Sequence, residues 1–85
     1  MQIPKLRVLS EAGAVRAVTA IYETEANGWE VQVGYATRSG ERREILERQR
    51  GGARVFATLD AVARTLGEAG VGAFRVVTPR SGAGW

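Results

Sequence analysis

The chain has 85 residues and a mass of 9.1 kDa, which suffices for one small domain but not for two independent cores. It has 12 Lys and Arg against 9 Asp and Glu, and it lacks His and Cys altogether. These absences exclude Ser-His and Cys-His catalytic pairs, zinc sites of the usual ligands and disulfides. No carboxylate pair or phosphate-binding glycine loop stands out, so we expect a non-enzymatic protein with no catalytic residues, metal, cofactor or small-molecule substrate.

The bulk composition, with 45% hydrophobic and 25% charged residues, is typical of a folded globular protein. A domain this small buries only roughly 60% of its unfolded surface, and such proteins often oligomerise, so we expect a homodimer. No apolar run approaches the roughly 18 residues of a membrane helix, and the first residues lack the apolar stretch of a secretory signal. We therefore expect a cytoplasmic protein without a membrane partner.

The first quarter of the chain is predicted to contain two strands. Residues 6–9 form a short one, and residues 15–24 form a longer one after the break at residues 11–13. Both faces of the longer strand are apolar, which fits a central strand covered on both sides or a strand at an oligomer interface. The two alternating sets are Val15, Ala17 and Ile21, and Val18, Ala20 and Tyr22.

A hairpin follows, signalled by Asn27-Gly28. This pair favours a type I′ turn, which needs positive φ at both central residues, and it makes residues 15–35 a hairpin. The returning strand alternates cleanly and buries one face. The residues of that face are Trp29, Val31, Val33 and Tyr35.

The next segment is open to two interpretations. A second turn at residues 38–41 leads into residues 42–50, which lack clear periodicity. The turn signals on both sides favour a solvated edge strand. Glu44 and Arg48, four residues apart, would also support a helix.

The clearest helix begins after Thr58, its predicted N-cap, with Asp60 placed favourably for the helix dipole in the first turn. Gly70 is suited to the position that follows its end. One apolar stripe of this helix is expected to face the sheet. It comprises Leu59, Val62, Ala63 and Leu66.

A last strand is predicted over residues 74–78, and Pro79 ends it before a flexible tail, residues 79–85. The expected element order is β-β-β-β-α-β. This is an α+β fold in which an antiparallel meander of about four strands packs on one helix and is followed by a last strand. Residues 1–78 are expected to form a single domain.

Charge is distributed unevenly along the chain. Residues 11–30 carry one arginine against four glutamates, whereas residues 38–54 carry six arginines against three glutamates. We call residues 38–54 the arginine-rich segment. Its arginines are the candidate nucleic-acid-binding residues: Arg38, Arg42, Arg43, Arg48, Arg50 and Arg54.

As an edge strand, the arginine-rich segment would place Arg42, Arg48 and Arg50 on one side, with Arg54 following beyond two glycines. Such a row would contact successive phosphates of a nucleic-acid backbone, because the planar guanidinium group fits the geometry of phosphate. Binding would release the counterions of those phosphates. The alternative is a solvated edge that resists aggregation and has glutamate partners within the segment. Codon bias in a GC-rich genome would also explain the excess of arginine over lysine.

Aromatic side chains, which stack on bases in single-strand binders, are few in this sequence. We expect Trp29, Tyr35, Phe56 and Phe74 to belong to the core. Tyr22 is undetermined, because both faces of its strand are apolar. Trp85 lies in the tail, where it is the end of the chain or a docking residue.

Several short motifs resemble those of small ParC-type plasmid partition-associated proteins, which are unrelated to the topoisomerase subunit of that name. The motifs are Arg54-Val55-Phe56-Ala57-Thr58-Leu59-Asp60, the helix stripe to Leu66, Gly70-Val71 and Phe74-Arg75-Val76, together with residues 3–10 and Val15-Arg16 at the start. The resemblance covers nearly the whole chain. It implies residence on plasmids or integrated mobile elements and an accessory part in their maintenance that could act through DNA, but it supplies no binding residues.

Two functions therefore compete. The first is an accessory module that binds nucleic acid, single- or double-stranded DNA, through the arginine-rich segment. The second is a homo-oligomeric interaction or assembly module that uses the doubly apolar strand 15–24 and binds no nucleic acid.

Overall fold

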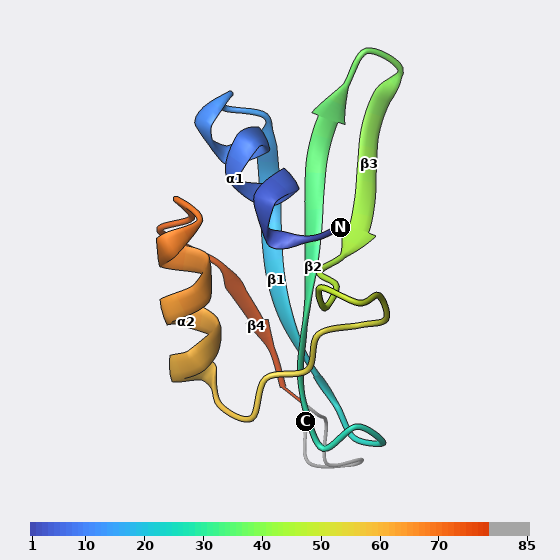
Figure 1. The fold of residues 1–85 in the computed structure, drawn as a ribbon, viewed down its shortest axis with the longest axis vertical. Coiled ribbons are helices and arrows are strands. Elements are labelled where there is room, and N and C mark those ends of the chain that lie inside the picture. The colour runs from blue at the N-terminus through green and yellow to red at the C-terminus, as the bar shows by residue number, and fades with distance from the viewer. Residues whose placement is uncertain (79–85) are drawn as a thin grey trace.

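The computed structural model describes residues 1–78, so the predicted tail, residues 79–85, lies outside the described residues. The fold is α+β, as predicted, with a four-stranded sheet and two helices (Figure 1). The elements in chain order are α1 (Ile3–Glu11), β1 (Val15–Glu23), β2 (Gly28–Thr37), β3 (Gly40–Ile45), α2 (Leu59–Glu68) and β4 (Arg75–Val77). Within residues 1–78, neither helix is long and apolar enough to cross a membrane.

The strand order in the sheet is β3-β2-β1-β4. The first three strands form the expected antiparallel meander, but β4 pairs with β1 in parallel, so the sheet is mixed. The predicted edge strand is confirmed: β3 lies at one edge of the sheet, although it ends at Ile45 and not at residue 50. Residues 54–56, which precede α2, contribute only a single bridge, between Phe56 and Trp29.

The prediction of a strand over residues 6–9 is wrong, because these residues lie in α1. Pro4 stands in the first turn of the helix, where its missing N–H costs nothing. Leu6 is fully buried and Val8 is 65% exposed, whereas a strand would turn both to the same face. The element order is therefore α-β-β-β-α-β in place of β-β-β-β-α-β, and two helices cover the sheet in place of one.

Both helices end in the same hydrogen-bond motif. After α1, Gly13 N donates to Ser10 O and Ala14 N donates to Leu9 O, and the φ of Gly13 is +70°. This is a Schellman motif, in which glycine adopts the left-handed conformation that other residues reach at a cost. The end of α2 repeats the two bonds around Gly70, whose φ is +91°, and so confirms the predicted helix end.

The predicted hairpin of β1 and β2 is confirmed, but the two-residue type I′ turn is not. The strands pair as far as Glu23 and Gly28, so four residues, 24–27, form the connection. Only Asn27 has a positive φ, +54°. Gly28 is needed for a different reason: a Cβ there would lie 2.5 Å from Val55 Cγ1 and 2.7 Å from the carbonyl oxygen of Phe56.

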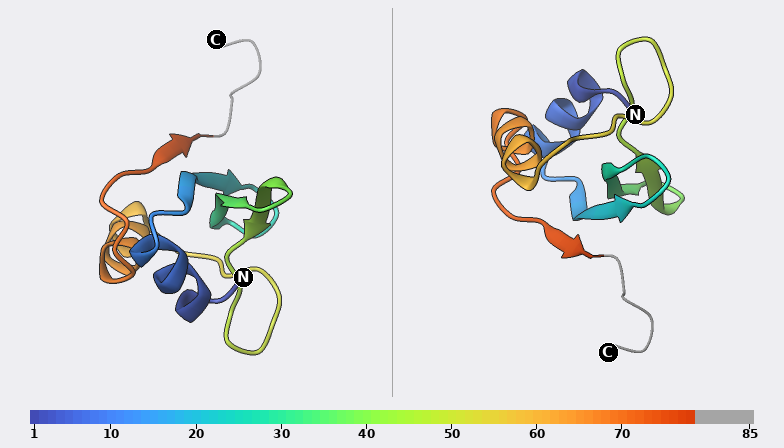
Figure 2. Two further views of the ribbon diagram at one scale, coloured as in Figure 1. Left: turned by 90° about the horizontal axis from the view of Figure 1, so that it is seen from above. Right: turned by 90° about the horizontal axis from the view of Figure 1, so that it is seen from below.

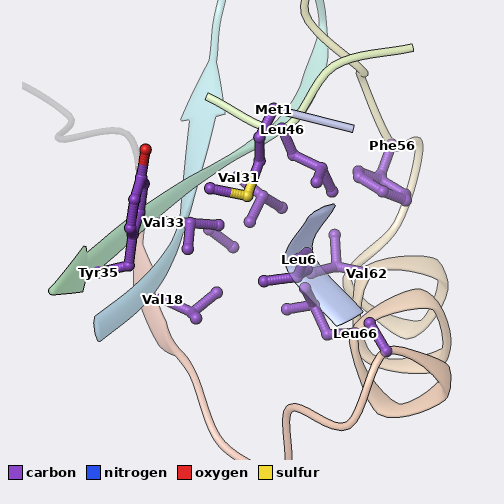
Figure 3. Close-up of a cluster of buried hydrophobic side chains, with 12 residues drawn as sticks. Met1, Leu6, Val18, Val31, Val33, Tyr35, Leu46, Phe56, Val62 and Leu66 are labelled. Carbon is purple, nitrogen blue, oxygen red and sulfur yellow. The ribbon is translucent and has the colours of Figure 1, made fainter. Parts of the chain in front are cut away.

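The core lies between one face of the sheet and the two helices (Figure 3). The predicted face of β2 is correct, since Val31, Val33 and Tyr35 are all buried. On β1 the set containing Val18 and Ala20 faces the core, and a register shift between Val15 and Ala17 places Val15 against the core as well. Within residues 1–78, β1 is thus covered on one face only. Helix α2 has the predicted N-cap, in which the Thr58 hydroxyl accepts a hydrogen bond from Ala61 N at 3.1 Å.

Candidate nucleic-acid interface

The arginine-rich segment runs along one edge of the molecule, from the turn between β2 and β3, through β3, and into the following loop (Figure 1). Arg38 lies in the turn, and Arg42 and Arg43 lie on β3. Because neighbouring strand residues point to opposite faces, Arg42 shares the helix side with Tyr35, whereas Arg43 shares the uncovered side with Gly34.

The predicted single row of Arg42, Arg48 and Arg50 is wrong, because the strand ends before the last two are reached. Residues 46–54 form a compact loop instead. Its ends are joined by hydrogen bonds from Arg48 N to Gly52 O and from Arg54 N to Leu46 O, both 2.9 Å long. Gly51 and Gly52, with φ of +91° and +79°, allow the chain to reverse.

Two of the six arginines have contacts within the protein. Arg48 Nε donates to the carbonyl oxygen of Gly51 at 3.3 Å and so steadies the loop. The guanidinium of Arg54 lies over the Phe56 ring, 5.1 Å from its centroid. The other four make no side-chain hydrogen bond or ion pair within residues 1–78, and all are exposed. They are Arg38, Arg42, Arg43 and Arg50.

Two of the three glutamates of the segment, Glu44 and Glu47, pair with cations elsewhere in the chain, whereas Glu41 is exposed and has no ion pair within residues 1–78. Glu44 pairs with the amino group of Met1 at 3.3 Å and with Lys5 Nζ at 2.9 Å, and Glu47 pairs with the same amino group at 3.2 Å. The predicted internal glutamate–arginine pairing does not occur for these two residues. No signal in the sequence links the first residues of α1 to β3, so this arrangement was missed.

Glu44 is the centre of a small polar network on the helix side of β3. Its carboxylate accepts hydrogen bonds from the Tyr35 hydroxyl and from Lys5 Nζ. The Tyr35 hydroxyl and the Lys5 ammonium lower the pKa of Glu44 to about 2. Hydrogen bonds to Glu44 and Tyr35 raise the pKa of Lys5. Glu44 therefore stays ionised through the physiological range, and its charge is balanced without an arginine.

The local charge is strongly positive. Six arginines, Lys5 and the Met1 amino group face only three glutamates, which leaves an excess of five positive charges around the segment. An excess of this kind attracts polyanions and raises their rate of association.

Aromatic side chains contribute little to this surface. Tyr35 and Phe56 are buried, and Trp29 and Phe74 pack against the core, as expected. Tyr22 packs edge-on against Trp29 with ring centroids 5.1 Å apart, on the helix side of the sheet. The uncovered face, as far as residue 78, therefore offers no aromatic ring on which bases could stack. Trp85 lies outside the described residues.

Within residues 1–78, no three acidic side chains gather closely enough to hold a metal ion. Comparison with known proteins finds no family model, no curated protein and no solved structure that matches this chain.

Proposed function

We propose that the protein is a non-enzymatic module that binds the phosphate backbone of nucleic acid through the arginine-rich segment. The observation that carries this proposal is the set of four exposed arginines without partners in residues 1–78, next to glutamates already paired with Met1 and Lys5. Guanidinium groups left free in this way are available for charge-assisted hydrogen bonds to phosphate oxygens.

The spread of these arginines favours a polymer over a small anion. Arg38 and Arg50 lie beyond opposite ends of β3, whose six residues span about 20 Å at about 3.3 Å per residue. A small anion would need several donors converging on one point. Charges spaced along an edge instead match a chain of phosphates, and contacts of this kind hold the backbone without reading the base sequence.

The proposal is tested with a pair of variants of equal net charge. Replacing Arg43 and Arg50 with Gln is expected to weaken oligonucleotide binding about tenfold, because each exposed charge contact is worth up to about 1 kcal/mol. The control replaces Arg7 and Arg64, exposed residues of the two helices, with Gln. Fluorescence anisotropy should show less than about a twofold loss for the control. Equal losses in the two variants would show that net charge, and not this segment, causes binding.

The second candidate, a homo-oligomeric assembly module without nucleic-acid binding, is favoured by one observation. No helix within residues 1–78 covers the second face of the sheet, where Ile21 lies beside the half-exposed Val77. A dimer that bound no oligonucleotide would favour this candidate over the first. A homodimer, a cytoplasmic location and a role in plasmid or mobile-element maintenance all stay predictions.

A further inference from the structure

An open hollow of about 330 Å³ lies between the loop after β3 and the first turn of α1. Its walls are Gln2, Ile3, Pro4, Glu47, Gln49 and Arg54. Gln2 links the start of α1 to the loop, since its Nε2 donates to the carbonyl oxygens of Gln49 at 3.0 Å and Arg48 at 3.4 Å. Both views in Figure 2 show the N-terminus at the base of this loop.

The chemistry of the hollow suits a planar, polar ring. Ile3 and Pro4 provide an apolar wall, and Gln2, Glu47 and Gln49 are the polar residues of the lining. Arg54 contributes a flat cation, which lies over the Phe56 ring. Guanidinium planes of this kind stack on nucleobases. Ligand pockets generally have roughly 300–1,000 Å³, so this hollow is at the small end and fits a single base.

A second depression, which carries two arginines, adjoins the hollow directly. Arg48, Gln49 and Arg50 line this shallower depression, and Gln49 is shared by the two. Arg50 is exposed and has no side-chain partner within residues 1–78. A nucleotide placed here would have its base beside Arg54 and its phosphate beside Arg50.

We infer that this hollow binds one unstacked base of a single-stranded nucleic acid, an inference that rests on the proposed phosphate binding by the arginine-rich segment. A base within a duplex is stacked and paired, so it cannot enter a pocket without being extruded at a cost. Single strands present their bases freely. The hollow thus favours single-stranded over double-stranded DNA, a choice that the sequence leaves open.

The test compares two fluorescein-labelled strands of equal length and charge, one of deoxythymidine and one of abasic deoxyribose units. Fluorescence anisotropy with the full chain should show about fivefold to tenfold tighter binding to the deoxythymidine strand, since stacking of one base contributes a gain of that order. The abasic strand should still bind through its phosphates.

Two conservative variants locate the effect. Arg54→Lys keeps the positive charge but loses the planar group, so it should lose the preference for bases and keep its affinity for the abasic strand. Arg50→Lys, on the phosphate side, should keep the preference. Urea denaturation of both variants establishes that they fold like the parent protein.

The outcomes separate the two proposals. Equal binding of the two strands by the parent protein would overturn the base pocket and leave phosphate binding intact. A preference that persists in Arg54→Lys would also overturn the pocket. Failure to bind either strand would contradict both the proposed phosphate binding and the base pocket.

Discussion

At the scale of single residues, the network of Tyr35, Lys5 and Glu44 links the fold to the candidate interface. Tyr35 is 4% exposed and aims its hydroxyl at the carboxylate, while Lys5 Nζ lies 5.2 Å from the Tyr35 ring centroid and bonds to both partners. The network ties α1 to β2 and β3. It also satisfies the carboxylate of Glu44, which would otherwise attract a neighbouring arginine.

The network makes stability depend on pH. The folded pKa of Glu44, about 2, is below its ordinary value of 4.5, so its contribution is complete above pH 4.5 and is lost as the pH falls to about 2. Tyr35→Phe removes the largest cause of this shift. We expect it to lower the free energy of unfolding by about 1–2 kcal/mol at pH 7, as for hydrogen bonds to charged groups, with the difference shrinking between pH 4.5 and 2.

Urea denaturation at a series of pH values measures this effect. Tyr22→Phe serves as the matched control, because the Tyr22 hydroxyl donates to the Asn27 side chain, which does not titrate. Its effect should be the same at every pH in this range. A constant difference between Tyr35→Phe and the parent protein from pH 7 to 2 would contradict the role assigned to Glu44.

At the scale of elements, the sequence predicted what local chemistry determines. Thr58 and Asp60 mark the start of α2, and the alternation of Val31 and Val33 identifies the buried face of β2. Helix α1 was missed because its four residues 6–9 are apolar enough to imitate a strand. A signal was present: Leu9-Ser10-Glu11-Ala12-Gly13 nearly repeats Leu66-Gly67-Glu68-Ala69-Gly70, which ends the helix that was predicted correctly.

The difference between helix and strand in this segment has a direct consequence for mutations. Leu6→Ala removes a fully buried side chain and should destabilise the protein by about 2–5 kcal/mol. Val8→Ala, at a position 65% exposed, should change stability by less than about 0.5 kcal/mol. Chemical denaturation measures both. Similar losses at the two positions would indicate that residues 6 and 8 share a buried face, as in a strand.

At the scale of the whole molecule, Glu44 and Glu47 of the arginine-rich segment reach their cationic partners only through tertiary contacts. The sequence identified the six arginines, but it could not show that Met1 and Lys5, some 40 residues earlier, neutralise Glu44 and Glu47. Nor could it show that the loop of residues 46–54 folds against the start of α1 and forms a hollow with Gln2. These contacts join distant parts of the chain, and periodicity and turn signals, which are local patterns, do not predict them.

The salt dependence of binding to a single-stranded oligonucleotide tests the central claim most directly. Each phosphate contact on a single strand contributes about −0.7 to the slope of log K against log salt concentration, so contacts by Arg38, Arg42, Arg43 and Arg50 predict a slope of about −3. A slope near zero, or no binding at about 50 mM salt, would contradict the account.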